Sequence, residues 1–297
     1  MTLSKEHIGA LLGLVGVIIF SATLPVTRMA LDGFDVVTVT AGRAALAGVL
    51  ALVLLIAMRR PVPTRYLGRL ALVALCLTVG FPGFTALAMK TVASAHGAVV
   101  LGILPLATAI AATLVAGERP SIAFFAVALT GAGLVTLFTV LAAGGIDIGI
   151  GDVALFAAAA AAALGYALSG TVARVMPGWE VICWVVVIAL PFSLAVTLFG
   201  AGDQFTTAPA HALAAFVYLG VMSQLVGFFF WNAGLAIGGV AKVGQIQLLQ
   251  TFFTIGFAAL LLGEAIDGFT IGFAVLVAAV VILGRKTRVT GPPAAPR

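Results

Sequence analysis

Polar side chains that stand inside long apolar stretches are the residues of this chain that could do chemistry. Arg43 lies within TAGRAALAGVLAL, and one lysine and three amides occupy a later apolar stretch, as Lys242, Gln245, Gln247 and Gln250. Arginine offers a rigid fork of N–H donors that fits a carboxylate, and an amide offers both donors and an acceptor. These residue types favour recognition of a small polar ligand.

Arg43 has two interpretations, which the sequence leaves open. It binds a substrate carboxylate through a two-pronged hydrogen bond, or it ties its helix to helix-end carbonyls or to a loop carboxylate such as Asp32 or Asp35. An unpaired guanidinium in lipid costs roughly 3 kcal/mol or more, so the side chain must face protein or water. An arginine close to a helix end can also extend toward the membrane surface, which favours the structural role.

The apolar segment 240–262 is unusual in its number of amides. At about 100° per residue, Lys242, Gln247 and Gln250 fall within an arc of about 140°, so one polar stripe is expected to face the protein interior. With Thr251 nearby, this stripe suits a zwitterion or another polar ligand. Alternatively, the glutamines bond to neighbouring helices, which contributes about 0.6 kcal/mol each.

Aromatic residues accompany amides in another segment, where GFFFWNAG follows Gln224 and contains Trp231 and Asn232. An aromatic wall with an amide suits flat apolar ligands, and a cation–π contact suits an organic cation. Trp231 lies near the expected end of its helix, where tryptophan at the membrane interface is equally common. Tyr166 lies nearer the centre of its segment, and either stacks on a ligand or bonds to neighbouring helices. Phe20, its counterpart in the first segment, is a further candidate for substrate binding.

Five further residues are expected to gate the protein or to support its structure. Lys90 and His96 bracket one turn and either gate the exit or anchor that turn. Glu118 and Glu264 each end a helix, which favours closure of the following turn over the carriage of protons. Pro105 favours a break in its helix.

The composition indicates whether this chain lies in water or in a lipid bilayer. Of its 297 residues 63% are hydrophobic and 8% are charged, and the mean hydropathy is +1.26, so we expect an integral membrane protein. A helix needs about 20 apolar residues to cross a bilayer, and the segments are apolar on all sides, unlike membrane strands. We expect ten transmembrane helices, near 8–31, 36–58, 68–89, 93–116, 121–141, 152–173, 180–200, 211–234, 240–262 and 267–284.

The chain aligns with itself at a constant offset of 146 residues. Phe20 falls on Tyr166, and Glu118 falls on Glu264. Each copy contains five segments, and an odd number of spans places the second copy upside down in the membrane. The fold class predicted is therefore an all-α membrane protein built from two inverted five-helix repeats.

The expected domains are a first repeat over 1–145, a second repeat over 146–286 and a short disordered tail over 287–297. Basic residues gather on the side that holds both termini, so both termini are expected in the cytoplasm. The net charge of +5 is explained by basic loops beside anionic lipid and does not indicate nucleic acid as a partner.

The sequence lacks the motifs of nucleotide hydrolysis, of serine hydrolases and of zinc proteases. We therefore expect no catalytic residue, no cofactor and no metal site. Cys76 and Cys183 fall within expected helices at positions that do not correspond in the repeat, so a disulfide is not expected.

Taken together, these features resemble the drug/metabolite transporter superfamily, and within it the EamA-type exporters. The resemblance rests on two halves of five helices, an aromatic residue in the first helix of each half (Phe20 and Tyr166), a G-E pair that ends each fourth helix, and Arg43 and Pro105. The family often has tryptophan at the two aromatic positions. Thr251 stands where the fourth-helix proline would repeat, which predicts that helix nine loses one break.

The resemblance implies a bacterial inner-membrane carrier that exports small metabolites through a cavity lined by helices one, three, four, six, eight and nine. An inverted repeat itself indicates alternating access. We expect a small-molecule substrate, most simply an amino acid or a related amphipathic compound, while coupling to a proton gradient and the choice between monomer and homodimer stay open. The alternatives are an uptake carrier or exchanger for sugars, nucleotide sugars or nucleobases, and a membrane-embedded enzyme or sensor.

Overall fold

The computed structural model describes residues 4–116, 119–143 and 149–263, and separate positions between 268 and 290. Within this described part, eight helices are long and apolar enough to cross a membrane, and a shorter apolar helix covers Ile122–Leu134. The eight spans are Lys5–Ala30, Val36–Ala57, Thr64–Met89, Ser94–Val115, Ile150–Val172, Gly178–Gly200, Ala210–Gly238 and Lys242–Leu262. Nine predicted segments thus coincide with apolar helices, and the tenth lies largely outside the described residues.

Most spans of the first half consist of several helical pieces. The bounds are α1 (Lys5–Ser21), α2 (Thr23–Ala30), α3 (Val36–Ala57), η1 (Thr64–Tyr66), α4 (Leu67–Ala74), η2 (Leu75–Gly80), α5 (Phe81–Met89), α6 (Ser94–Val100), η3 (Leu101–Ile103), α7 (Leu104–Ala111), η4 (Ala112–Ala116) and α8 (Ile122–Ala143). Here η2 and η4 are π-helical, whereas η1 and η3 are 3₁₀ turns.

The second half shows a similar division. Its bounds are α9 (Ile150–Val172), α10 (Gly178–Gly200), α11 (Gln204–Thr207), α12 (Ala210–Tyr218), η5 (Leu219–Val226), α13 (Gly227–Gly238), α14 (Val240–Gly244), η6 (Gln245–Gln247) and α15 (Leu248–Leu262). The element η5 is π-helical and η6 is a 3₁₀ turn. A two-residue antiparallel pairing joins β1 (Arg119–Pro120) to β2 (Val289–Thr290). Val289 and Thr290 belong to the tail that was predicted to be disordered, and the structure pairs them with β1.

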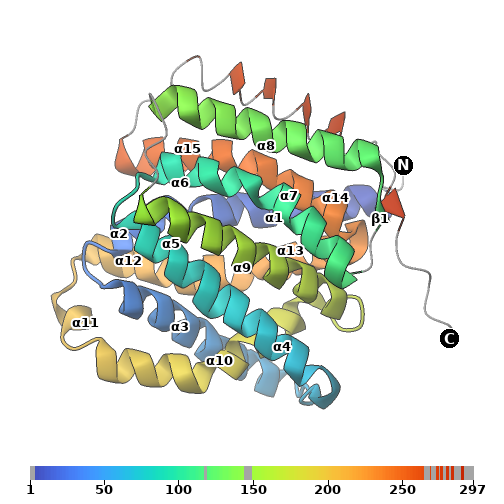
Figure 1. The fold of residues 1–297 in the computed structure, drawn as a ribbon. Coiled ribbons are helices and arrows are strands. Elements are labelled where there is room, and N and C mark those ends of the chain that lie inside the picture. The colour runs from blue at the N-terminus through green and yellow to red at the C-terminus, as the bar shows by residue number, and fades with distance from the viewer. Residues whose placement is uncertain are drawn as a thin grey trace.

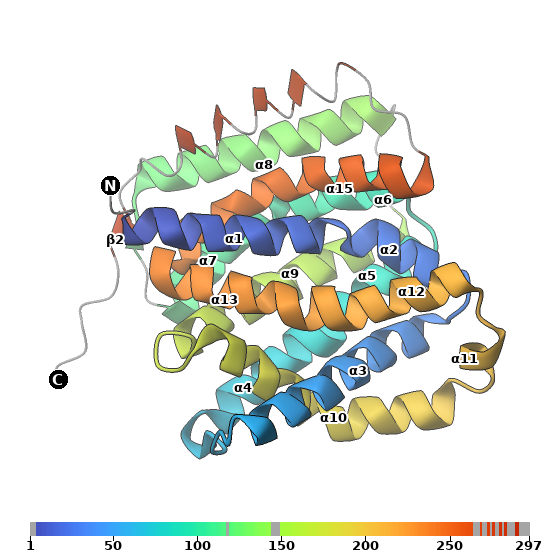
Figure 2. The same cartoon turned by 180° about the vertical axis from the view of Figure 1, so that it is seen from behind.

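The spans lie side by side between two ends of the bundle (Figures 1 and 2). We call the end where α1 begins the N-terminal face, and the end that carries α11 the opposite face. The helix α1 starts at the N-terminal face, whereas α9, the first helix of the second half, starts at the opposite face (Figure 1). The two halves therefore run in opposite senses, as the odd number of spans predicts.

The third and fourth spans and their counterparts, the eighth and ninth, are interrupted at similar places. The π-helical turns η2 and η5 interrupt the third and eighth spans, and the 3₁₀ turns η3 and η6 interrupt the fourth and ninth. The prediction that Thr251 would remove a break from the ninth span is wrong. The break forms at Gln245–Gln247, four residues earlier, and it needs no proline because a 3₁₀ turn keeps its own backbone hydrogen bonds.

Glycines allow the first and eighth spans to pack closely. A Cβ at Gly9 would lie 2.6 Å from the backbone nitrogen of Gly238, and a Cβ at Gly234 would lie 2.8 Å from that of Gly13. Small residues at a helix crossing let two backbones approach, which is how membrane helices gain van der Waals contact when lipid is as apolar as leucine. This crossing joins the first half of the chain to the second.

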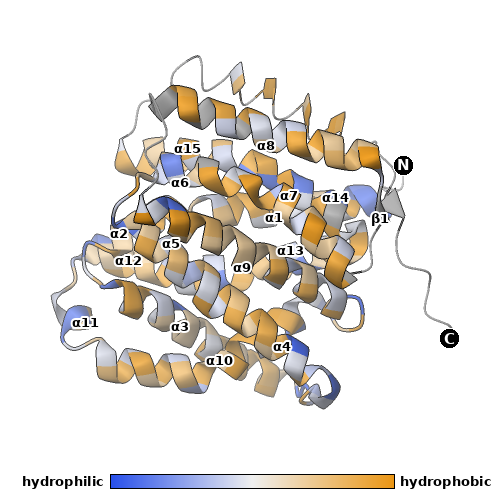
Figure 3. Cartoon of the chain, in the orientation of Figure 1, coloured by the Kyte–Doolittle hydropathy of each residue, from blue (hydrophilic) through white to orange (hydrophobic). Residues whose placement is uncertain are grey.

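The surface of the bundle is apolar and the interior is partly polar, the reverse of a water-soluble protein. Large apolar side chains are exposed on the outside, such as Phe199, at 90%, and Leu260, at 77%. Apolar residues cover the helices throughout, and hydrophilic ones gather at the ends and at a few places within the bundle (Figure 3). Apart from the short β1–β2 pairing, the described fold is thus a helical bundle with the apolar surface of a membrane protein.

A side chain at the opposite face ties the two halves together. The Asp35 carboxylate accepts hydrogen bonds from the Thr38 N–H, at 2.7 Å, and from Nε2 of Gln204, at 2.9 Å, while the Asp35 N–H donates to Oε1 of Gln204 at 2.8 Å. Partial burial works to raise the pKa of the Asp35 carboxyl. The hydrogen bonds from Thr38 and Gln204 outweigh it and hold that pKa below its ordinary value.

The glycine crossing generates a stability prediction. We expect Gly234→Ala to lower the free energy of unfolding by about 1–3 kcal/mol, because the new methyl group meets backbone atoms that cannot move aside. Gly256→Ala is the matched control: a Cβ there meets nothing within 4 Å, so the change is expected to be neutral or slightly stabilising. Thermal unfolding of both variants in detergent measures the difference, and equal melting temperatures would contradict the proposed packing.

The hydrogen bonds of Asp35 generate a second stability prediction. Asp35→Ala removes the cap of α3 and the bond to Gln204, and is expected to cost about 1–2 kcal/mol near neutral pH. Because the folded state lowers the carboxyl pKa, this contribution is complete above the ordinary value of about 3.9 and is lost as the pH falls through the folded value. Melting temperatures in detergent at pH 7 and pH 3 should show the wild-type advantage shrinking at pH 3. A constant advantage refutes this account.

Candidate functional site

Arg43 lies at the centre of a buried polar cluster. It is the eighth residue of its span, farther from the nearer end than any other charged residue in the described spans, and only 2% of it is exposed. Its Nη2 donates to the Ser223 hydroxyl at 2.8 Å, and the Ser223 hydroxyl is also 2.8 Å from that of Thr23. Arg43 also lies close enough to Tyr166 and Tyr218 to interact with them electrostatically. Four spans therefore meet at one guanidinium.

We define the central polar site by the residues that surround this guanidinium, namely Thr23, Arg43, Tyr166, Tyr218, Ser223 and Gln224. The Tyr218 hydroxyl donates to the carbonyl of Ile19 at 2.8 Å, and Nε2 of Gln224 donates to the carbonyl of Leu77 at 3.1 Å. Each bond joins one half of the chain to the other.

The structural role expected for Arg43 as a tie to a loop carboxylate is wrong. Asp35 is bonded to Thr38 and Gln204, and Asp32 lies 3.1 Å from Nε2 of His211. The guanidinium does not extend to the membrane surface either, because it is almost fully buried. Among the described residues Arg43 forms no ion pair, and its Nε has no hydrogen-bond partner.

Aromatic rings pack beside the central polar site. Tyr166 lies 5.3 Å from Trp231 and 6.0 Å from Phe228, and Phe20 lies 4.8 Å from Phe228, measured between ring centroids. We call these four residues the aromatic cluster. The interpretation of Trp231 as an interfacial residue is wrong, since its side chain is fully buried where α13 crosses α1.

The glutamines of the ninth span lie inside the protein, but not as the single stripe that was predicted. Gln245 and Gln247 are buried and Gln250 is half-buried, and several of their amide atoms have no partner among the described residues. The 3₁₀ turn advances by about 120° per residue rather than 100°, so the predicted arc does not hold here. Ile246 in the same turn lies close to Gly13, which also faces Trp231, so the turn borders the aromatic cluster.

Lys242 does not belong to this group. Its Nζ lies 3.1 Å from Oε1 of Glu6 at the N-terminal face, where it pairs the start of α14 with the start of α1. The ion pair removes Lys242 from the predicted binding stripe, because its charge is already matched by a carboxylate at the helix end.

A second pair, at the opposite face, also joins a basic side chain to an acidic one near the starts of two helices. Nε2 of His96 lies 2.6 Å from Oδ1 of Asp152, and Oδ2 of Asp152 accepts from the Gly149 N–H at the start of α9. The offset of 146 residues that relates the two repeats also relates Glu6 to Asp152 and His96 to Lys242. The two acid–base pairs are therefore repeat equivalents that lie at opposite ends of the bundle.

Asn232 is held by protein at both ends of its amide. Its oxygen accepts from the Ser169 hydroxyl at 2.8 Å and its nitrogen donates to the carbonyl of Gly178 at 3.2 Å. These bonds tie α13 to α9 and to the start of α10, which leaves Asn232 a structural role rather than the ligand contact predicted for it.

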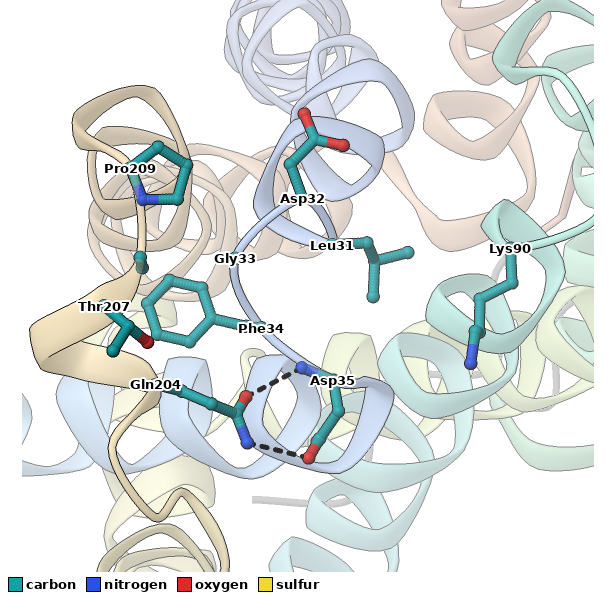
Figure 4. Close-up of a pocket in the computed structure, with 10 residues that line it drawn as sticks. Leu31, Asp32, Gly33, Phe34, Asp35, Lys90, Gln204, Thr207 and Pro209 are labelled. Atoms are coloured by element: carbon teal, nitrogen blue, oxygen red, sulfur yellow. Dashed lines mark hydrogen bonds between the residues drawn. The ribbon is translucent and has the colours of Figure 1, made fainter.

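A pocket of about 400 Å³ opens at the opposite face (Figure 4). The loop before α3 and the segment from Gln204 to Pro209 form one side of it, and Lys90 lies across from Gln204. Lys90 forms no ion pair within the described part of the chain. Since Asp35 caps the helix that carries Arg43 two turns further on, the pocket lies about 12 Å along α3 from the central polar site.

The remaining predicted positions add little to the site. Pro105 follows η3 as the second residue of α7, where a proline suits the start of a helix. Glu118 and Glu264 lie outside the described residues. Among the residues that are described, no three potential metal ligands converge.

Sequence reasoning missed Thr23, Ser223 and Tyr218, which complete the central polar site. Their hydroxyls are common in membrane helices, where they often bond to a carbonyl of their own helix, so the residue types carried no signal. Glu6 and Asp152 were missed as well, although the offset of 146 residues would have identified them as equivalents.

Comparison with known proteins is consistent with this arrangement. The model of the EamA-like transporter family matches residues 7–141 and again 149–284. One curated relative, named uncharacterized transporter YdeK, from Bacillus subtilis (strain 168), is 41% identical over 265 residues, which is 89% of this chain and 92% of that protein. Another, named probable terminal-alkyne amino-acid exporter, from Streptantibioticus cattleyicolor, is 27% identical and covers 91% of both chains.

A solved crystal structure shares the fold, with a TM-score of 0.70 over 94% of this chain and 96% of its own at 20% sequence identity. The family match extends over both halves and nearly the whole sequence. This chain therefore belongs to the EamA-like transporter family.

Proposed function

We propose that this protein is a secondary carrier that exports small metabolites across the bacterial inner membrane by alternating access, with amino acids or related amphipathic compounds as substrates. The two repeat-equivalent acid–base pairs at opposite ends of the bundle are the observation that carries the proposal. The name of the relative described as a probable amino-acid exporter supports the substrate class. The domains are the two repeats, 1–145 and 146–286.

We call these two pairs latches, because each joins two helices at one face of the bundle. Glu6 and Lys242 form the first latch, beside a cavity of only about 10 Å³ at the N-terminal face. His96 and Asp152 form the second latch, at the opposite face, where the larger pocket opens. In an inverted repeat the two faces are built from equivalent helices, so an exchange of conformation between the halves interchanges the open face and the closed face.

The N-terminal face is proposed to lie in the cytoplasm. Its described basic residues include Lys5, Arg59, Arg60 and Arg65, and cytoplasmic loops carry an excess of such residues. On this orientation the pocket beside Lys90 faces away from the cytoplasm and provides the exit. The carrier acts as a monomer or a homodimer.

Proton coupling is proposed to run through the second latch. His96 and Asp152 form a histidine–carboxylate pair inside a membrane-spanning bundle, a combination that recurs in proton relays. Proton exchange on this pair would change the contact between His96 and Asp152 at the opposite face, and so would link a proton gradient to the exit step.

Carriers of phosphorylated sugars or nucleotide sugars need several cations in the binding site to balance the charge of the substrate. Lys242 is matched by Glu6, so Arg43 is the cation that the described interior leaves for a substrate. This count supports a substrate with a single negative group over the alternative of a nucleotide sugar.

The export proposal is tested by transport in liposomes that contain the purified protein. We expect saturable flux of one or more labelled amino acids from a panel of L-leucine, L-phenylalanine and L-propargylglycine, with a rate that changes when a proton gradient is imposed. Protein-free liposomes provide the background. An absence of flux for every amino acid would refute the proposed substrate class.

The first latch is tested by the accessibility of Ala10, a buried residue that lines the small cavity beside it. Ala10→Cys is labelled with a membrane-impermeant maleimide, in a chain whose two buried native cysteines are replaced by alanine. We expect Lys242→Ala to raise the labelling rate about two- to fivefold, because an exposed ion pair contributes about 0.5–1 kcal/mol.

Two variants control this experiment. Lys90→Ala removes a lysine at the opposite face and is expected to leave the labelling rate unchanged. The exchange Glu6→Lys with Lys242→Glu restores the pair and should restore slow labelling. The latch is disproved if Lys242→Ala labels as slowly as its parent.

A further inference from the structure

We infer that Arg43 binds the carboxylate of the transported metabolite and that Oε1 of Gln224 accepts a hydrogen bond from its amino group. The ligand class is a zwitterionic monocarboxylate with an apolar side chain that packs on the aromatic cluster. This inference rests on the proposed function, because it describes the substrate site of that carrier.

The first argument is the charge of Arg43. Only 2% of Arg43 is exposed, and no carboxylate among the described residues pairs with it. A buried charge without a partner is unfavourable in any protein and more so between membrane helices, where it marks a functional site. A substrate carboxylate supplies the missing negative charge.

The second argument is the geometry of the guanidinium. Only Nη2 forms a hydrogen bond within the described part of the chain, to Ser223, and Ser223 is itself held by Thr23. The fork is therefore held in place while Nε remains without a partner. A carboxylate that binds in a two-pronged manner needs a fixed fork with free N–H donors, which is what these contacts leave.

Gln224 supplies the third argument. Its Nε2 donates to the carbonyl of Leu77, so the orientation of the amide is determined, and Oε1 must be the atom that points elsewhere. That oxygen is buried and has no partner among the described residues. A buried acceptor without a donor costs about 1–3 kcal/mol, and the ammonium group of a zwitterion provides the donor.

The fourth argument is that these groups share one neighbourhood. A Cβ at Gly165 would lie 2.5 Å from the side chain of Leu77, the residue that Gln224 contacts, and Gly165 precedes Tyr166. Tyr166 in turn interacts with Arg43 and packs on Trp231. Gln224 also directly follows Ser223, which accepts a hydrogen bond from Arg43. Arg43, the proposed donor to the carboxylate, thus lies beside both the apolar wall and the residue next to the proposed amine acceptor.

The experiment measures binding to the purified protein in detergent, independently of transport. The probes are L-leucine and three analogues that each lack one feature: leucinamide and 3-methylbutylamine lack the carboxylate, and 4-methylpentanoate lacks the amine. We expect the wild type to bind L-leucine at least tenfold more tightly than leucinamide or 3-methylbutylamine.

Three variants assign the contacts. Arg43→Gln should weaken L-leucine at least tenfold and leave 3-methylbutylamine unchanged. Gln224→Met should weaken L-leucine severalfold and leave 4-methylpentanoate unchanged. Arg28→Gln is the matched control, since this arginine contacts the carbonyl of Val92 near the opposite face and should not affect any probe.

Folding of each variant is checked by gel filtration and melting temperature. If Arg43→Gln does not fold, Arg43→Lys keeps the charge but loses the fork, and should bind L-leucine more weakly than the wild type. Equal binding of L-leucine by the folded Arg43 variant and the wild type overturns the inference, as does a wild type that binds none of the probes. Carboxylate-dependent binding that requires Arg43, without flux in liposomes, would instead refute export and leave the site in place.

Discussion

The burial of one guanidinium is the constraint that the interior of this protein accommodates. Arg43 stands two turns inside a membrane-spanning helix, where neither water nor lipid headgroups can solvate it. The surrounding helices supply the hydroxyls of Thr23 and Ser223 and the phenols of Tyr166 and Tyr218, but no carboxylate. The protein thus solvates the charge in part, and we propose that a ligand neutralises it.

Broken helices make this arrangement possible. Ser223 and Gln224 belong to the π-helical turn η5, and Leu77, whose carbonyl binds Gln224, belongs to the equivalent turn η2. A π-helical turn inserts one residue into the hydrogen-bond ladder and so re-aims the side chains around it, and such turns are frequent at functional sites. The two turns face each other across the interface between the halves, so that local irregularity in each half builds one shared site.

Hydropathy and the internal repeat predicted most of the fold, because the length of an apolar segment and the parity of five spans are properties of sequence alone. The site was harder to predict. Arg43 and Tyr166 are conspicuous by type, whereas Ser223 acquires its role only from the crossing that brings the eighth span beside the second. Lys242 was wrongly predicted to belong to the binding stripe. Its partner Glu6 is 236 residues away in the sequence, and no local pattern joins the two residues.

Under the proposed mechanism, the groups at the two faces move and the groups at the centre recognise the substrate, and the two halves differ in how they repeat these groups. The latches are repeated, with Glu6 equivalent to Asp152 and His96 to Lys242, so each face has its own acid–base pair. Among the proposed binding groups, Phe20 and Tyr166 are equivalent, but the two groups on which the proposal most depends are not repeated. The position equivalent to Arg43 in the second half is an alanine, and that equivalent to Trp231 in the first half is a threonine. A carrier needs two interchangeable faces but only one substrate orientation. If the proposed mechanism holds, equivalent pairs at the two faces and unlike residues at the centre meet both requirements with a single duplicated chain.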